Sequence, residues 1–226
     1  MIDQSTPDGR VLAAALECAA ARSWAEVSLL DVAERAKVPL AEMRASFPSR
    51  SAILAELVRR VDAQVLSRSE RAQGQEKRDL LFDVLMTRFD VLAPYKAAVK
   101  SIAGSGNADL TLLGPLLSSQ HWMLQAAGID TSGPSGALRV AGLAAVYASV
   151  FRTWLEDDDP GHARTMAALD RRLRRGERAL RQLDGTAATF ARIATSAPAL
   201  LRALLRGGGK GARDSAPASE PEPPNP

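Results

Sequence analysis

The feature that most constrains the fold is a set of helix start and stop signals between residues 27 and 57. Ser28 stands three residues before an aspartate, an arrangement in which a hydroxyl and a carboxylate cap the same helix start. Pro39 fits the first position of a following helix, because its missing amide hydrogen has no helical partner to lose. Ser49 or Ser51 then caps a longer helix. This stretch predicts a short helix, a tight turn, a second short helix and a capped third one.

Such a layout is typical of DNA reading, in which one helix lies across the backbone and the next enters the major groove. The major groove is informative because each base pair presents a distinct edge there. We expect residues 10–21 to form a bracing helix, since their apolar residues recur at helical spacing. Residues 39–46 are the expected reading helix, and Phe47 is expected in the core. The N-terminal part of the chain is therefore expected to bind DNA.

The rest of the chain also follows a helical pattern, without strands or internal repeats. Further helices are expected at residues 79–92, 95–102, 110–127 and 138–155, and another one capped by Asp159 with Pro160 in its first position. The helix at 138–155 is apolar on most sides, which predicts burial or a subunit interface. The fold class is all-α. We expect a three-helix head (residues 1–66), a helical-bundle body (67–206) and a disordered tail (207–226).

Charge and cysteine content indicate which partners and which cellular compartment suit the protein. The net charge of +3 and the pI near 9.3 suit DNA or anionic lipid, without deciding between them. Arginines are concentrated in residues 171–181, after an acidic turn at 156–159. The simplest interpretation is a solvent-exposed helix face whose positive charges interact with that turn. Cys18 is the single cysteine, so no intramolecular disulfide forms, which favours a reduced cytoplasmic compartment. No signal peptide or membrane-spanning stretch is recognised.

The head resembles the tetracycline-repressor (TetR) family of regulators. The resemblance covers about residues 11–66 and rests on Ser28, the Asp-Val-Ala run at 31–33, and the Phe-Pro-Ser-Arg signature at 47–50. It implies a homodimer that binds a palindromic operator. The DNA contacts that it implies fall on Ser28, Leu40, Glu42, Arg44, Ser46 and Arg50. The reading helix departs from the family pattern at Pro39, Leu40, Glu42 and Arg44, so the reading surface is either weakened or retargeted.

The same resemblance implies a body that binds a small apolar effector. Aromatic and methionine side chains of the body are the candidates for lining such a pocket. They are Met86, Phe89, Trp122, Met123, Tyr147, Phe151 and Trp154. The alternative is that these side chains are ordinary core.

A second resemblance lies in the body. The segment from Tyr147 to Leu173 is similar to the C-terminal signature of ubiquinone-biosynthesis accessory proteins, which share the TetR-like fold and bind lipid instead of regulating genes. This similarity implies a body that holds an isoprenoid tail and a last amphipathic helix that touches the membrane. Thr189 to Arg206 is the candidate helix, with packing on the body as its alternative role.

Nothing in the sequence predicts catalysis. His121 and His162 are isolated from other metal-ligand residues, so we expect no metal site, and no cofactor motif is present. We expect a non-enzymatic TetR-type DNA-binding regulator that acts as a repressor, with a pocket for an apolar small-molecule effector in its helical body. The alternative is a lipid-binding accessory protein of ubiquinone biosynthesis with peripheral membrane contact.

Overall fold

The chain is described by a computed structural model, which defines residues 2–69, 74–106 and 110–183. Over these ranges the secondary structure consists of helices and turns without any strand, which confirms the predicted all-α class. The expected amphipathic helix at 189–206 and the expected tail at 207–226 lie outside the described residues. The polar composition of residues 67–78 predicts a loop, and part of that segment also lies outside the described residues.

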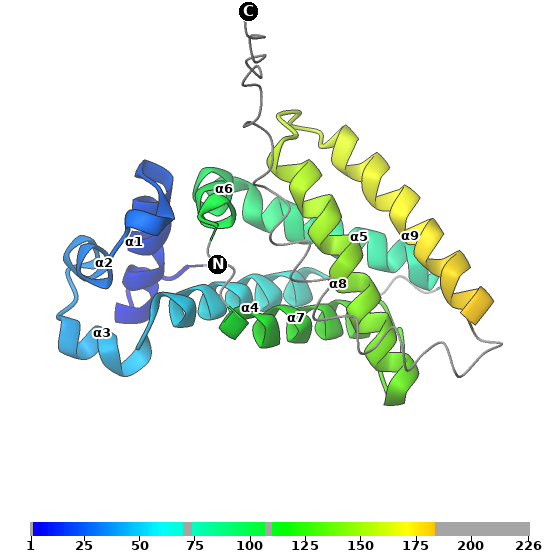
Figure 1. The fold of residues 1–226 in the computed structure, drawn as a ribbon, viewed down its shortest axis with the longest axis horizontal. Coiled ribbons are helices and arrows are strands. Elements are labelled where there is room, and N and C mark those ends of the chain that lie inside the picture. The colour runs from blue at the N-terminus through cyan, green and yellow to red at the C-terminus, as the bar shows by residue number, and fades with distance from the viewer. Residues whose placement is uncertain (1, 70–73, 107–109, 184–226) are drawn as a thin grey trace, which may run out of the picture.

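The head is a compact group of three helices at one end of the molecule (Figure 1). They are α1 (Pro7–Ala21), α2 (Leu29–Ala36) and α3 (Leu40–Ser46), with a short 3-10 helix, η1 (Trp24–Glu26), between the first two. The apolar stripe of α1 includes Val11, Leu12 and Leu16, each at most 5% exposed. Because α1 packs against both α2 and α4, it braces the head as predicted.

The helix caps of the head follow the sequence signals closely. Ser28 and Asp31 form the predicted reciprocal capping box at the start of α2. Lys37 ends this helix in the left-handed region, with a φ of 54°. Ser49 caps α4 (Arg50–Arg68) by accepting from the amide of Ala52 at 3.1 Å. Pro39 differs from the expectation by one residue, since it precedes α3 and accepts its first backbone hydrogen bond through its carbonyl.

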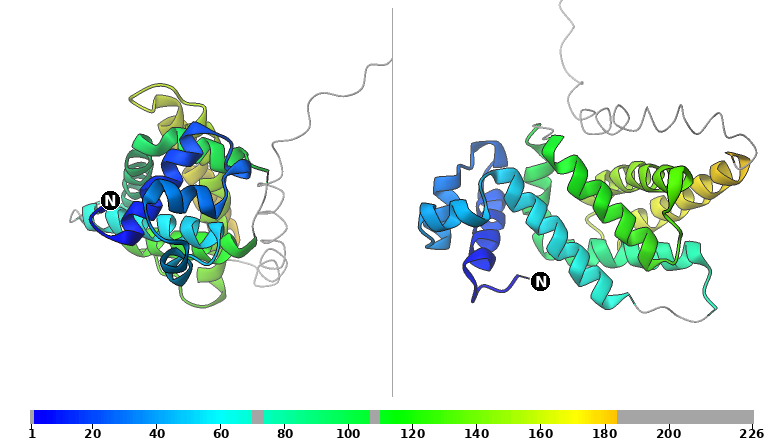
Figure 2. Two further views of the ribbon diagram at one scale, coloured as in Figure 1. Left: turned by 90° about the vertical axis from the view of Figure 1, so that its left-hand side faces the viewer. Right: turned by 90° about the horizontal axis from the view of Figure 1, so that it is seen from below.

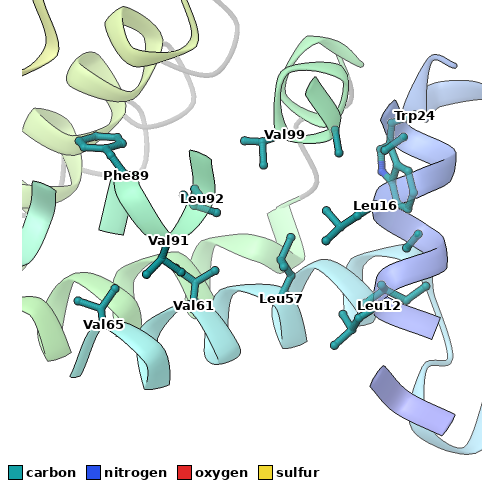
Figure 3. Packing of buried hydrophobic residues seen from close by; sticks show 14 of the residues in the cluster. Leu12, Leu16, Trp24, Leu57, Val61, Val65, Phe89, Val91, Leu92 and Val99 are labelled. Atoms are coloured by element: carbon teal, nitrogen blue, oxygen red, sulfur yellow. The ribbon is translucent and has the colours of Figure 1, made fainter. Parts of the chain in front are cut away.

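Helix α4 joins the head to the body and is buried along one side. Leu57 lies near Leu12 and Leu16 of α1, while Val61 lies close to Val91 of α5 (Figure 3). The two parts therefore share one apolar core instead of being connected by an open linker. Burial of these side chains contributes roughly 1.5–3 kcal/mol each.

Between residues 74 and 183, with the gap at 107–109, the described part of the body has five long helices and two short ones. They are α5 (Lys77–Leu92), η2 (Ala93–Tyr95), α6 (Lys96–Gly104), η3 (Leu110–Leu112), α7 (Leu113–Ala126), α8 (Gly133–Leu155) and α9 (Ala163–Leu183). Helices α4, α5 and α7 pack together, and α8 packs between α7 and α9. Helix α9 lies at the opposite end of the elongated molecule from the head (Figures 1 and 2).

The starts of α8 and α9 differ from the predicted ones by several residues. The glycines between residues 128 and 136 predict a turn over that segment. The observed turn is shorter, because helix α8 already starts at Gly133. Helix α9 starts at Ala163, because Pro160 and the next two residues form a turn that ends with His162 at a φ of 53°. By length and composition alone α8 could cross a membrane. Core helices of soluble proteins pass the same test, and Val150 and Trp154 of α8 are fully buried.

A second contact fixes the head on the body, away from α4. The amide of Trp24 donates to the hydroxyl of Ser101 at 3.0 Å, and that hydroxyl donates to the carbonyl oxygen of Arg22 at 3.0 Å. Ser101 belongs to α6, which packs directly against α1. The orientation of the head is thus held at two places.

Candidate functional site

The predicted reading helix presents an open face to solvent. Leu40 is 49% exposed, and Glu42, Arg44 and Ser46 are also exposed. Met43 and Phe47 turn inward and are 2% and 3% exposed, so they anchor the helix to the head. Neither Glu42 nor Arg44 has a hydrogen bond or ion pair within the described ranges. Four of the six candidate DNA-contact residues therefore share one accessible surface.

Ser28 is already engaged at the start of α2. Its hydroxyl donates to Asp31 Oδ2 at 2.6 Å and accepts from the Asp31 amide at 3.1 Å. Arg22 Nη2 lies 2.6 Å from the same carboxylate oxygen. The hydrogen bonds from Arg22 and then from Ser28 hold the pKa of Asp31 well below its usual value. A phosphate at this position would be next to the Asp31 carboxylate and to a Ser28 hydroxyl that already donates its hydrogen to that carboxylate.

Arg50 has an internal position, which corrects its expected role as a phosphate contact. Its Nη1 atom donates to the carbonyl oxygens of Trp24 at 2.8 Å and Val27 at 2.9 Å, with a longer contact of 3.3 Å to Ala25. Its guanidinium carbon lies 5.7 Å from the centre of the Trp24 ring. These carbonyls follow α1 and precede α2, and the Trp24 carbonyl also accepts from the Val27 amide at 3.3 Å. Arg50 therefore ties the start of α4 to the loop between these helices.

The distribution of charge is the reverse of what a DNA-binding head requires. Residues 1–66 carry nine acidic and eight basic side chains, a net charge of −1. Helix α9 carries seven arginines and two acidic residues, a net charge of +5. Because phosphate neutralisation by lysine and arginine supplies most non-specific affinity for DNA, the head lacks the usual electrostatic attraction. The positive charge of the chain lies at the far end of the body.

Four of the seven predicted ligand residues form a closed aromatic cluster, and the other three are Met86, Met123 and Trp122. The rings of Phe89, Tyr147, Phe151 and Trp154 stack or tilt against each other with centres 5.4–5.8 Å apart. Phe89, Met123 and Trp154 are fully buried, and Met86 is partly buried. Trp122 is 50% exposed and packs edge-on against His121. Neither the cavity of about 300 Å³ beside α1 and α6 nor the groove of about 650 Å³ beside α9 is lined by any of the seven residues.

A buried polar network lies beside this cluster and was missed in the sequence. Arg88 of α5 donates to Asp62 of α4 and, through Nε, to the Tyr147 hydroxyl at 3.0 Å. Ser119 of α7 donates to the same Asp62 oxygen at 2.8 Å. Burial disfavours the charged form of Arg88, but Tyr147 and Asp62 outweigh this effect and raise its pKa. Burial raises the pKa of Tyr147 as well.

The sequence contained one signal of this network. Arg88 falls on the apolar face of α5, in register with Leu81, Leu85 and Leu92. A charged residue on a buried face requires a partner of opposite charge. The partner, Asp62, comes from a helix that precedes it by 26 residues, and sequence spacing does not identify such a pair.

The acidic turn before α9 is used to build the helix start. Asp157 is 1% exposed, and its Oδ2 accepts from the amide and hydroxyl of Thr165 at 2.8 and 2.6 Å. Burial alone would raise the pKa of Asp157, but these hydrogen bonds outweigh burial and lower it. Asp159 accepts from the amides of Gly161 and Ala163, each at 3.1 Å. The predicted cap is therefore present, although the helix starts three residues later.

Comparison with solved structures finds the same fold over about three quarters of the chain. The TetR transcriptional regulator from Nitrosomonas europaea ATCC 19718 is 22% identical, with a TM-score of 0.60, and the match covers 75% of this chain and 97% of that chain. A TetR transcriptional regulator from Rhodococcus sp. RHA1 is also 22% identical, with a TM-score of 0.57 and coverages of 74% and 93%. At this level of identity the similarity establishes a common fold.

Comparison with protein families identifies one segment of the body. The model of the COQ9 family matches residues 139–179, which include most of α8 and the greater part of α9. No curated protein matches the chain significantly. The chain therefore has the all-α fold of TetR regulators and resembles the COQ9 family of ubiquinone biosynthesis in its α8 and α9 segment.

Proposed function

We propose that this protein is a non-catalytic, lipid-binding accessory protein of ubiquinone biosynthesis built on a TetR-like fold. The observation that carries the proposal is the charge distribution, with a net −1 on residues 1–66 and +5 on α9. The segment that resembles the COQ9 family, residues 139–179, includes most of the positively charged helix α9. This arrangement favours contact with anionic lipid at the α9 end over contact with DNA at the head.

The contacts within the head support the same proposal. Arg50 is held by backbone carbonyls, and Ser28 and Arg22 are held by Asp31. Of the expected contact residues, Arg44 is the single basic group that faces solvent without a partner in the described structure, and Glu42 lies two residues before it. A carboxylate at this place opposes the approach of a phosphate backbone.

Lipid binding in the body requires movement of side chains, because the aromatic cluster is closed. Met86 and Phe151 are only partly buried and lie at the edge of the cluster. They are the side chains whose displacement would admit an apolar tail between α5 and α8. The protein is expected to act as a homodimer in the cytoplasm, with its lipid drawn from a membrane surface.

Native mass spectrometry of freshly purified protein tests the proposal directly. We expect a protein species that carries one quinone-like or isoprenoid lipid per subunit, and extraction with organic solvent should remove the added mass. A Phe151→Asp variant should lose the lipid, whereas Trp122→Ala, at an exposed aromatic outside the cluster, should keep it. Protein that is recovered without lipid, and that does not take up added ubiquinone in detergent, would contradict the proposal.

A second candidate function is operator binding, which the open face of α3 favours. It predicts tight binding to DNA from upstream of the protein's own gene, with a steep dependence on salt. Fluorescence anisotropy of Arg44→Gln, with Arg59→Gln as a charge-matched control on α4, separates base reading from general attraction. Nanomolar binding that Arg44→Gln removes and Arg59→Gln preserves would establish the regulator in place of the accessory protein.

A further inference from the structure

A basic groove runs along α9 where this helix packs on α8. Its volume is about 650 Å³, and its lining includes Arg164, Arg171, Arg172 and Arg175, three alanines of α9, and Thr153 of α8. The four arginines recur at intervals of seven, one and three residues, so they follow one side of the helix. The alanines between them keep the floor of the groove low and apolar.

The spacing of the arginines sets the size of group that they can hold together. Arg171 and Arg175 are one helical turn apart, about 6 Å along the axis, and Arg172 lies beside them. Arg164 is about 10 Å further toward the start of the helix. Three arginines therefore line the same part of the groove, and Arg164 extends the lining toward the start of the helix.

The acidic residues nearest to the groove do not neutralise it. Asp170 is paired with Arg174, whose Nε lies 2.9 Å from both carboxylate oxygens. Arg174 does not line the groove. Glu177 does not line the groove.

The arginine run forms no ion pair with the acidic turn in the described structure, which differs from the expectation that it answers that turn. Asp157 is used by Thr165, and Asp159 is used by the backbone at the start of α9. Arg164 reaches only the carbonyl oxygen of Glu156, at 3.5 Å. Within the described part of the chain, Arg171, Arg172 and Arg175 have no carboxylate partner. Like charges this close repel each other, and a bound anion would relieve that repulsion.

We propose that this groove is a binding site for a phosphate-bearing ligand, with Arg171, Arg172 and Arg175 holding the phosphate group. Guanidinium groups suit this ligand because each donates two parallel hydrogen bonds to phosphate oxygens. The Thr153 hydroxyl faces the same space from α8, and the alanine floor accommodates a carbon chain attached to the phosphate. The ligand is a phospholipid headgroup or a free phosphate ester. The inference goes beyond the proposed function, since the groove can bind phosphate whether or not the body holds a quinone-like lipid.

Isothermal titration of the full-length protein with sodium pyrophosphate tests the site. We expect saturable binding at one site per chain, weakened at least about tenfold in the double variant Arg171→Gln with Arg175→Gln. Arg139→Gln removes one positive charge from α8 outside the groove without freeing a carboxylate, and its affinity should stay within about twofold of the parent. Circular dichroism should show unchanged helix content in all variants. A double Arg→Lys variant, which keeps the charge, should bind with intermediate affinity because lysine lacks the bidentate geometry.

Vesicle sedimentation distinguishes the two sources of phosphate. Binding to phosphatidylglycerol vesicles but not to phosphatidylcholine vesicles, with the same dependence on Arg171 and Arg175, assigns the site to a lipid headgroup. Pyrophosphate binding without vesicle binding assigns it to a free phosphate ester, and either result supports the site. Absence of both kinds of binding would overturn the proposal, as would an equal loss in Arg139→Gln. Arginine-dependent binding of duplex DNA alone would overturn it too.

Discussion

Arg50 and Trp24 are joined through both the backbone and the ring, since Arg50 Nη1 donates to the Trp24 carbonyl at 2.8 Å and its guanidinium carbon lies 5.7 Å from the ring centre. Trp24 is 5% exposed and also donates its amide to Ser101 of α6. One residue of the head thus contacts the start of α4 and the body together. This relationship places Arg50 among the residues that set the position of the head.

Replacement of Arg50 should therefore lower stability. We expect Arg50→Gln to reduce the free energy of unfolding by about 2 kcal/mol, because its charge-assisted hydrogen bonds to the carbonyls of Trp24 and Val27 are lost. Urea unfolding measures the change. Arg44→Gln, an exposed arginine without a partner in the described head, should alter stability by less than about 0.5 kcal/mol. Equal stabilities for the two variants would contradict the internal role of Arg50.

The buried ion pair of Asp62 and Arg88 should be sensitive to loss of one partner. Arg88→Met leaves the Asp62 carboxylate buried without its counter-charge, which costs about 3–5 kcal/mol. The double variant Asp62→Leu with Arg88→Met removes both charges and should recover a large part of this loss. A double-mutant cycle in urea unfolding measures the coupling. The exposed pair of Asp170 and Arg174, tested in the same way, should show a coupling below about 1 kcal/mol.

Asp31 should make the stability of the head depend on pH. Its pKa in the folded protein lies below the ordinary value of 3.8, through hydrogen bonds from Arg22 and Ser28. As the pH falls, Asp31 is therefore protonated at a higher pH in the unfolded chain than in the folded protein. The stabilising contribution is fully present above about pH 5 and is lost progressively below about pH 4.

Urea midpoints of the parent protein and of Asp31→Asn, measured from pH 7 to pH 3, test this sign. The difference in stability between the two proteins should be largest at neutral pH and should shrink toward pH 3. A difference that grows as the pH falls would show that Asp31 is not held in its ionised form by Arg22 and Ser28.

Two glycines of α8 should respond oppositely to alanine. A Cβ atom at Gly136 would lie 2.0 Å from the carbonyl oxygen of Thr131, which forces the turn between α7 and α8 to shift. Gly136→Ala should therefore lower the melting temperature. At Gly142 a Cβ atom meets open space, and Gly142→Ala should stabilise the helix by up to about 1 kcal/mol. Thermal unfolding followed by circular dichroism compares the two variants, and a gain in both would exclude the close contact at Gly136.

The local structure of the head could be predicted because its signals are short-range. The capping box of Ser28 and Asp31 and the cap at Ser49 depend on groups three residues apart, so the sequence contains both partners. The end of α5 near Pro94 is of the same kind. The start of α9 was placed three residues too early, because Pro160 in a first helical position and Pro160 in a preceding turn have the same sequence signature.

The candidate sites were predicted less well, because their partners are distant in the sequence. The exposed face of α3 follows from the helical spacing of Met43 and Phe47, but the inward position of Arg50 depends on carbonyl groups 23–26 residues away. Likewise, the seven predicted ligand residues were chosen by residue type. Type alone did not distinguish the closely packed Phe89 from the exposed Trp122.

The sequence by itself determined the helical class, most helix boundaries and the concentration of positive charge on residues 163–183, since periodicity, caps and charge are local properties of the chain. Only the tertiary structure decided which charged groups are neutralised. Asp62 and Arg88 come together in the core, and Asp157 turns to Thr165, which leaves the arginines of the α9 groove without an acidic partner in the described structure. The reason is physical, because ion pairing depends on distance in space and a charge pattern along the chain does not fix that distance.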